Sequence, residues 1–351
     1  MKKKLAIVGF ILLLFVVYVA KTLHETGFFR TIEQNQPDKI IANIPLVGAE
    51  DITASLDGEF LIISSFDRAK NRTEVVERGD IYFVDLKTEG FKPKLISGNF
   101  KKTLRPHGIS LIRLDSNLHR LFVINHVDDV NSIEVFNLYN RDSLVHEKTL
   151  IDEAMFSPND ILAVGANEFY FTNDKGYSTQ WGKIRENYLG KKGGSVMYFD
   201  GTTYRKVAKG FAYANGINYD STRNLVYVAA TRDFLIKVFQ KENNGNLTYI
   251  ESIPCGTGVD NIELDENADL WIGCHPSLLA YQSYSQGKKD KAPSEILKIN
   301  YKNKGDYTIN SVFVDDGTNI SGMATASVFK HFIFTGNVMD DHFLVLKHET
   351  N

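Results

Sequence analysis

The segment from Val259 to Cys274 reads VDNIELDENADLWIGC, and it holds the pattern that decides the fold. A polar pair stands directly before an apolar residue, a turn-forming stretch follows, and a short apolar strand closes the segment. The same arrangement recurs along the chain, at Glu50-Asp51-Ile52, His107-Gly108-Ile109, Asn159-Asp160-Ile161, Asn215-Gly216-Ile217, Asp260-Asn261-Ile262 and, in degraded form, Gly322-Met323-Ala324. The third residues of these six units are 57, 52, 56, 45 and 62 positions apart, a repeat of roughly fifty residues that is typical of propeller blades.

The stretches between the polar pairs predict strands. Short runs rich in aromatic and β-branched residues, such as 121–124 and 225–228, are bounded by turn residues. Four-stranded sheets arranged radially, each with its first strand lining a central channel, fit this order. We therefore predict an all-β, six-bladed β-propeller over residues 46–351, with one helix near residues 178–191. A long β-sandwich is the structural alternative, but it gives no reason for polar pairs at blade-like intervals.

Composition excludes some classes of protein and leaves others open. The net charge of −3 over 351 residues gives no electrostatic footprint for nucleic acid, so no nucleic-acid partner is expected. Hydrophobic residues make up 43% of the chain, which is enough for a large core. Cys255 and Cys274 are too few for a disulfide framework, and a single bridge between them stays open.

The N-terminus differs from the rest of the chain. Lys2, Lys3 and Lys4 precede an uncharged, mainly apolar stretch from Leu5 to Ala20. A basic flank before an apolar run is an export signal, and its length favours an uncleaved signal-anchor over residues 1–21, with a cleaved signal peptide as the alternative. Residues 22–45 are predicted to be a linker. The positive-inside rule keeps the lysines in the cytoplasm, so the large domain is expected outside it, anchored to the membrane, or secreted if the signal is cleaved.

The polar pairs predict a metal site. If each pair begins an innermost strand, its side chains meet around one axis. Asp and Asn at strand starts commonly just form turns, but here they keep one phase of the repeat. The oxygen-bearing side chains are those of Glu50, Asp51, Asn159, Asp160, Asn215, Asp260 and Asn261. Four of them are carboxylates, which would balance two Ca²⁺ ions, and backbone carbonyls such as that of Ile109 could complete the coordination.

Two histidines are candidates for acid–base chemistry. His107 occupies the slot that carries a metal ligand in other repeats, and His126 ends the following strand. Two strands of one blade could bring both imidazoles to the channel mouth, where a neutral imidazole beside a bound metal is suited to deprotonate water. Either histidine could instead satisfy a loop hydrogen bond. His275 is predicted to be structural, and the chain has no Gly-x-Ser-x-Gly motif of a serine hydrolase.

At these residues the chain resembles the paraoxonase/arylesterase family of calcium-dependent six-bladed propellers. The matching stretches run in order from about residue 45 to the C-terminal region, and they are GAEDI (48–52), RPHGIS (105–110), VINH (123–126), PNDILAVG (158–165), YANGIN (213–218), VDNIELD (259–265), LWIGCHP (270–276) and ATASVFK (324–330). The apolar N-terminal segment also looks like the retained signal of that family.

The resemblance implies roles for individual residues. It implies a catalytic calcium held by Glu50, Asn159, Asn215, Asp260 and Asn261, and a deeper structural calcium held by Asp51, Asp160 and the Ile109 carbonyl. It further implies His107 as the base with His126 as its partner, Tyr213 as a pocket wall, and Cys274 as a free pocket cysteine. Mammalian members join their two terminal segments by a disulfide that this chain lacks, so closure of the ring is expected to depend on strand pairing alone.

The residues and the resemblance together predict a calcium-dependent ester hydrolase, a lactonase or arylesterase, acting on a small-molecule ester or lactone. Calcium would polarise the substrate carbonyl, and His107 with His126 would activate water. Two alternatives remain at this point. One is a strictosidine-synthase-like or gluconolactonase-like enzyme, and the other is a non-catalytic propeller that calcium stabilises. The loop at 66–72, FDRAKNR, is charged, so the substrate range of the family is not expected to transfer.

Overall fold

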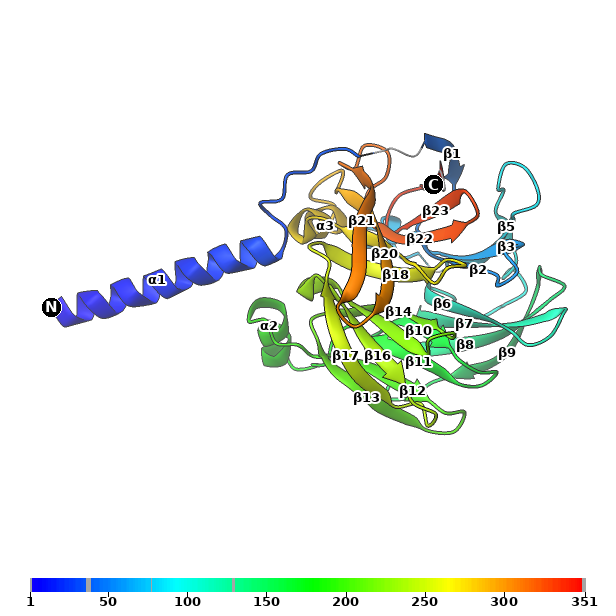
Figure 1. The fold of residues 1–351 in the computed structure, drawn as a ribbon, viewed down its shortest axis with the longest axis horizontal. Coiled ribbons are helices and arrows are strands. Elements are labelled where there is room, and N and C mark those ends of the chain that lie inside the picture. Colours follow the sequence, from blue (N-terminus) through cyan, green and yellow to red (C-terminus); the bar gives the residue numbers. More distant parts are fainter. Residues whose placement is uncertain (1, 36–38, 77, 128–129, 349–351) are drawn as a thin grey trace.

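The computed structural model describes residues 2–35, 39–76, 78–127 and 130–348, and it shows a six-bladed β-propeller with an N-terminal helix (Figure 1). Each of the six sheets has four antiparallel strands. The first three blades are β2 Ala49–Ala54, β3 Phe60–Ser65, β4 Asp80–Asp85 and β5 Lys94–Leu95; β6 Pro106–Arg113, β7 Leu118–Val127, β8 Val130–Tyr139 and β9 Ser143–Leu150; and β10 Pro158–Ala163, β11 Phe169–Asn173, β12 Gly194–Phe199 and β13 Tyr204–Phe211.

The last three blades complete the ring. They are β14 Ala214–Asp220, β15 Leu225–Ala230, β16 Leu235–Lys241 and β17 Leu247–Pro254; β18 Gly258–Leu264, β19 Leu270–His275, β20 Ser294–Asn303 and β21 Asp306–Asp315; and β22 Met323–Phe329, β23 Phe332–Asn337, β24 His342–Lys347 and β1 Lys39–Pro45. The predicted fold class is therefore confirmed.

Strand β1 closes the ring. It pairs antiparallel with β24, so the outermost strand of the sixth blade comes from the opposite end of the chain. Part of the predicted 22–45 linker is thus a strand of the propeller, and the domain starts before residue 46. Strand β1 was not predicted, because a bulge interrupts it near Ile40 and its pairing partner lies about 300 residues away, beyond any hairpin signal.

The linker is also fixed to the fifth blade. Both terminal nitrogens of Arg30 donate to the carboxylate of Glu295 on β20, each at 2.7 Å. The backbone of Asn35 pairs with that of Val314 on β21. The segment after the N-terminal helix is therefore part of the folded structure.

A β-bulge marks the polar pair in every innermost strand. The register shifts lie at Ala49/Asp51, Pro106/Ile109, Pro158/Ile161, Ala214/Ile217, Val259/Ile262 and Met323/Thr325. A bulge leaves its extra residue out of the ladder and redirects its side chain. The repeated polar pair is thus the sequence signature of six bulges, and these turn the polar side chains toward the channel while the next apolar residue stays buried.

Glycine replaces the second member of the pair where strands approach closely. A Cβ on Gly108 would lie 2.6 Å from Asp160 Cα, and one on Gly216 would lie 2.6 Å from Asn261 Cα. Any side chain at these positions would collide with backbone of the next ligand-bearing blade. The two glycines therefore allow the innermost strands to converge.

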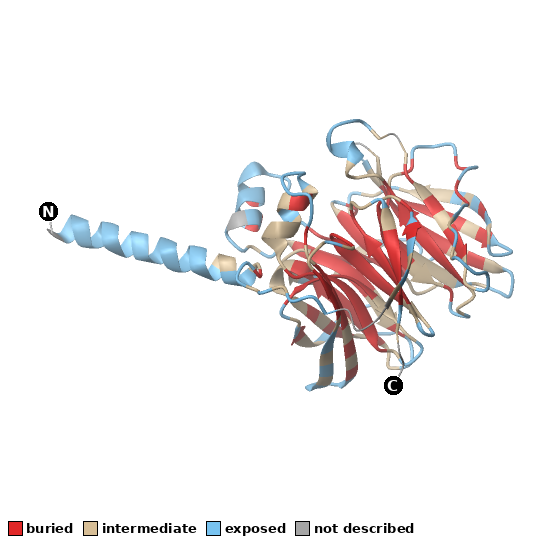
Figure 2. Ribbon diagram, turned by 90° about the horizontal axis from the view of Figure 1, so that it is seen from above, coloured by how far each residue is buried: buried red, intermediate tan, exposed pale blue. Residues whose placement is uncertain are grey.

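Apolar side chains fill the spaces between neighbouring blades. Figure 2 shows the strands of the ring as largely buried, whereas the N-terminal helix is exposed along its length. One cluster joins the fourth and fifth blades through Tyr227, Val238 and Ile272, and another joins the fifth and sixth through Trp271 and Ile333. This packing between rigid sheets is what holds the innermost strands at fixed positions.

Among the residues that the structure describes, three α-helices lie outside the sheets. Helix α2, Gln180–Tyr188, confirms the helix predicted near 178–191, and the Thr179 hydroxyl caps it by accepting from the Gly182 N–H. Helix α3, Leu278–Ser285, was not predicted, because its eight residues follow β19 almost directly and have little amphipathic pattern. Helix α1, Lys2–Glu25, is exposed and apolar over Lys3–Glu25, so its length and composition are compatible with a membrane anchor or a signal sequence.

Candidate active site

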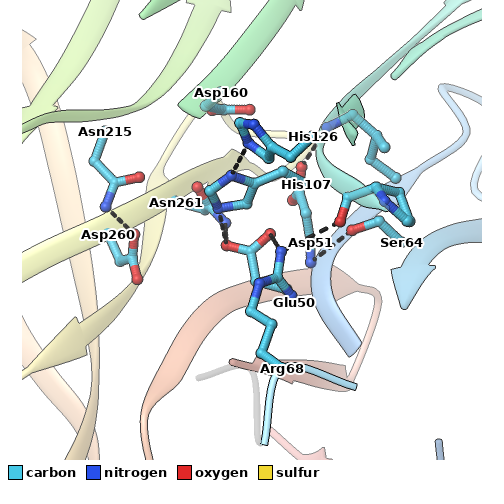
Figure 3. Close-up of polar contacts among 12 residues, drawn as sticks. Glu50, Asp51, Ser64, Arg68, His107, His126, Asp160, Asn215, Asp260 and Asn261 are labelled. Carbon is cyan, nitrogen blue, oxygen red and sulfur yellow. Dashed lines mark hydrogen bonds and ion pairs between the residues drawn. The ribbon is translucent and has the colours of Figure 1, made fainter. Parts of the chain in front are cut away.

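The side chains of the polar pairs meet at the channel, with Glu50 near their centre (Figure 3). Asn261 Nδ2 lies 3.3 Å from Glu50 Oε1, and His107 Nε2 lies 3.4 Å from the same oxygen. Arg68 Nη2 lies 3.9 Å from Glu50 Oε2. Burial alone would raise the pKa of Glu50, but the charges and hydrogen bonds of His107, Arg68 and Asn261 lower it to about 2. Glu50 is therefore an anion at neutral pH.

The predicted upper ligands are all buried and close to one another. Asn215 Nδ2 donates to Asp260 Oδ1, and Asn261 contacts Glu50 across 211 positions of sequence. Asn159 is buried at the start of β10, and the charges of Glu50 and Asp260 act on its neighbour Asp160. The structure thus brings residues from the first, third, fourth and fifth blades to one place, as the repeat predicted.

Three oxygens of this set have no hydrogen-bond partner. Within the described ranges, Glu50 Oε2, Asn159 Oδ1 and Asn215 Oδ1 are buried and accept no hydrogen bond. Leaving a buried acceptor unsatisfied costs about 1–3 kcal/mol, and native structures rarely tolerate it. Carboxylate and amide oxygens are ligands that calcium prefers, so these residues fit a calcium ion.

The candidate ligand set contains both carboxylate and amide side chains, and this mixture indicates which metal ion it suits. Among the described residues, no three His, Cys, Asp or Glu side chains form a group arranged to hold a metal ion. Three of the five candidate ligands of the upper group carry amide side chains, and amides are not among the His, Cys, Asp and Glu side chains of such a group. A hard cation that accepts amide oxygens suits this set better than zinc, which favours sulfur and imidazole ligands.

A second acidic group, the predicted deeper one, consists of Asp51 and Asp160. Asp51 Oδ2 accepts the backbone N–H of Ile109 at 2.8 Å, and Asp160 Oδ2 accepts that of Ile217 at 2.7 Å. Burial raises the pKa of each carboxyl well above its usual range, and neighbouring carboxylates raise it further. A cation bound here would oppose both shifts by stabilising the ionised carboxylates, so this position favours a positive ion. No contact of the Ile109 carbonyl tests its predicted role.

Glu263 joins the deep group and was not predicted. It lies on β18, and burial together with the charge of Asp160 raises its pKa well above the usual range. The only sequence feature that could have indicated Glu263 is its position three residues after Asp260 on the same strand.

The two predicted histidines are in direct contact. His107 Nδ1 lies 3.0 Å from His126 Nε2, and His126 Nδ1 lies 2.7 Å from Asn131 Oδ1. Asn131 in turn donates its Nδ2 to the backbone carbonyls of Met155 and Phe156, at 3.0 and 3.3 Å. Burial lowers the pKa of His126 to about 4, helped by the charge of His107, so this imidazole is neutral at pH 7.

These contacts assign the protons of both rings. Because the Asn131 amide nitrogen is committed to carbonyls, its oxygen faces His126 and must accept from Nδ1–H. A neutral His126 then has its lone pair on Nε2, which accepts from His107 Nδ1–H. In a neutral His107 the lone pair is then on Nε2, the atom that faces Glu50, whereas in a protonated His107 the same atom carries the N–H that donates to Glu50. Asn131 is therefore the end of a chain that prepares His107 as a base, and sequence reasoning missed it.

Other predicted residues surround this centre. Tyr213 has a left-handed backbone, φ 67°, and the charge of Asp174, together with burial, raises its phenol pKa well above the usual range. Cys274 is fully buried in the apolar cluster between the fourth and fifth blades, and both Cys274 and Cys255 are free thiols. Their possible disulfide is thus absent, while the pocket roles of Tyr213 and Cys274 stay predictions.

His275 has more than a structural contact. Its Nε2 lies 2.8 Å from Asp260 Oδ2, and its ring stacks on Tyr281 of α3 with centroids 3.8 Å apart. A hydrogen bond to a candidate ligand fixes the direction of the carboxylate, as in established metal sites. Its place at the end of β19, opposite the start of β18, is set by strand pairing and could not be seen in the sequence.

A six-bladed propeller whose channel mouth combines a carboxylate and amide cluster with a histidine dyad defines the class of this protein. The family model described as Arylesterase matches residues 48–344, and the chain belongs to this family. It is 33% identical over 267 residues to serum paraoxonase/arylesterase 2 of Rattus norvegicus, covering 74% of each chain. It is 31% identical over 349 residues to serum paraoxonase/arylesterase 1 of the same species, covering 95% of this chain and 96% of that one.

Solved structures agree on the fold. A luciferin-regenerating enzyme matches with a TM-score of 0.55 and 11% sequence identity, over 90% of this chain and 97% of that chain. At this identity the likeness concerns the architecture alone.

Proposed function

We propose that this protein is a calcium-dependent ester hydrolase of the lactonase or arylesterase type. Membership of the arylesterase family supports hydrolysis of esters or lactones. The observation that carries the mechanism is the meeting of the His107–His126 dyad with a set of buried, unsatisfied oxygens.

Calcium fits both groups of oxygens. Glu50, Asn159, Asn215, Asp260 and Asn261 would hold the upper ion, and Asp51, Asp160 and the Ile109 carbonyl the deeper one. A bound upper ion supplies a Lewis acid that polarises the substrate carbonyl and balances the charge that develops on its oxygen. The deeper ion would act in stability, because the acids there also bond to backbone N–H groups of the next blade.

His107 takes the proton of the attacking water. Its Nε2 carries the lone pair, and the imidazolium that forms lies 3.4 Å from Glu50 Oε1, whose negative charge stabilises it. His126 accepts the Nδ1–H of His107 and holds the ring in position, and Asn131 keeps His126 in the required tautomer. A positioned base of this kind contributes about 10²–10⁴-fold to the rate.

Helix α1 would anchor the enzyme in a membrane. Its 23-residue apolar span is long enough to cross a bilayer, and the basic residues before it would remain in the cytoplasm. The propeller would then lie on the extracytoplasmic side. N-terminal sequencing of the protein from membranes tests this, since a retained Met1 region supports the anchor and a start near residue 21 supports a cleaved signal.

The function is tested with phenyl acetate and a δ-lactone, each with calcium and with excess chelator. Hydrolysis that is lost in chelator and restored by calcium supports the proposal. Full activity in chelator contradicts the use of calcium. Saturable calcium binding without turnover on a broad panel of esters and lactones identifies a non-catalytic propeller instead.

A further inference from the structure

Arg68 belongs to the charged loop that follows β3, and the mechanism above gives it no role. In the structure its guanidinium reaches the candidate active site (Figure 3). Nη2 lies 3.9 Å from Glu50 Oε2 and donates to the Pro106 carbonyl at 3.2 Å. Pro106 directly precedes His107. The cation therefore lies beside a candidate calcium ligand and against the backbone that carries the proposed base.

One end of this guanidinium has no partner. Among the described residues, Nη1 of Arg68 is buried and makes no hydrogen bond, and the side chain as a whole is 17% exposed. A charged donor removed from water without an acceptor is costly. An acceptor on a bound substrate would remove that cost.

The loop holds Arg68 in a fixed position. Arg72 Nη1 donates to the carbonyls of Tyr284 and Ser285 in α3, at 2.9 and 3.2 Å. Asp67 Oδ1 accepts the backbone N–H of Lys70 at 2.7 Å, at the start of a short 3₁₀ turn, Lys70–Arg72. The guanidinium is thus preorganised by the protein and does not need to be ordered by a ligand.

If a divalent cation occupies the upper group, the charges around Arg68 would leave one positive charge uncompensated. Glu50 and Asp260 are the two carboxylates of the upper group, and a divalent cation there balances both. Two other titratable side chains interact electrostatically with Arg68, and both are neutral at pH 7. Burial raises the pKa of the Tyr281 phenol above its usual range and lowers the pKa of the His126 imidazole to about 4. With the metal bound, Arg68 therefore adds a single net positive charge in a largely buried place.

We infer that Arg68 is a specificity-determining residue that binds an anionic group, a carboxylate, on the ester or lactone substrate. The inference rests on the proposed hydrolase function. The planar guanidinium fork matches a carboxylate in shape and hydrogen-bonding pattern, and the free Nη1 provides the donor. Substrates that carry a negative charge are then preferred over neutral ones of the same size.

Two measurements on the full chain in detergent, with calcium, test this inference. The first compares kcat/KM for phenyl acetate with kcat/KM for its two carboxylate-bearing relatives, phenyl hydrogen succinate and 4-acetoxybenzoate. The second measures binding of benzoate by calorimetry, which needs no turnover. The variant is Arg68→Gln, and the matched control is Lys70→Gln, which removes an exposed charge from the same loop.

We expect Arg68→Gln to lower the preference for at least one anionic ester over phenyl acetate about tenfold or more, and to weaken benzoate binding by a similar factor. Lys70→Gln should change neither ratio. Unchanged selectivity together with unchanged benzoate affinity in Arg68→Gln overturns the inference. If no protein hydrolyses any ester but benzoate binding still depends on Arg68, the proposed function fails while the anion subsite stands.

Discussion

Asn131 Oδ1 lies 2.7 Å from His126 Nδ1, and this contact determines which nitrogen of each ring in the dyad carries a proton. The Asn131 amide cannot turn over without losing its two hydrogen bonds to backbone carbonyls. The orientation of one amide, outside the cluster of polar pairs, therefore prepares the base at the centre of the site.

Asn131→Leu is expected to lower kcat about tenfold or more, because it removes the acceptor that fixes the His126 tautomer while keeping a side chain of similar size. Asn131→Asp is the matched variant. It keeps the oxygen but adds a negative charge, which raises the pKa of His126 from about 4 and moves the acid limb of the pH–rate profile to higher pH. Wild-type kinetics in Asn131→Leu would show that the contact has no part in turnover.

His107→Gln is expected to lower kcat/KM about 100-fold or more, since the glutamine cannot accept a proton from water. His126→Gln should cost less, because it removes the partner and leaves the base. Calcium affinity and the thermal midpoint serve as controls, and both should stay close to those of the wild type. A His107→Gln enzyme with near-normal turnover would rule out this histidine as the base.

Glu50→Gln and Asp51→Asn separate the two groups of oxygens. Glu50, whose pKa is about 2, is an anion at any working pH, so its neutralisation should weaken one calcium site and abolish most activity. Asp51→Asn should weaken the other site and lower the thermal midpoint, with a smaller direct effect on turnover. Calorimetric titration of calcium checks this, and a single class of sites altered equally by both variants would contradict the division.

Metal-free protein is expected to lose stability as the pH rises. Asp51 and Asp160 have folded pKa values well above their usual range, so the folded state keeps protons that the unfolded state has released above about pH 4. The contribution of these two groups to the free energy of unfolding is therefore fully present below that pH, and it decreases as the pH rises toward their folded pKa values. Thermal midpoints between about pH 5 and pH 8, with and without calcium, should diverge as pH increases. A constant gap would argue against carboxylate ligands.

Arg30→Met is expected to destabilise the propeller, because it leaves the buried Glu295 carboxylate without its bidentate partner. Loss of one partner of a buried pair costs about 3–5 kcal/mol, and the partial exposure of Arg30 reduces this to about 1–3 kcal/mol. Urea denaturation of the wild type, Arg30→Met and the double variant with Glu295→Gln measures it. Equal midpoints in the wild type and Arg30→Met would show that the ion pair is not needed for stability.

The parts of the fold that repeat along the chain were predictable. Ile52, Ile109, Ile161, Ile217 and Ile262 mark one phase in five of the six units, and the polar residues before them lie where that phase places them. The repeat carries this information because each innermost strand needs the same bulge.

Contacts made between different elements were not predictable. Asn131 and His275 act through partners that strand pairing alone brings near, and Arg68 depends on the path of a loop. Strand β1 was missed for the same reason, since its partner is encoded at the other end of the sequence. A repeat in the sequence can indicate a geometry that recurs in each blade, whereas these contacts form only when the blades are assembled into a ring.

The pairing of β1 with β24 also sets a condition on how the protein is made. Strand β24 is synthesised about 300 residues after β1, with which it pairs. Ring assembly can finish only after β24 has been made, and the cluster of polar side chains, which draws on the first and fifth blades, is complete only after the fifth blade has been made. Strand β1 must therefore wait, unpaired, until β24 follows it.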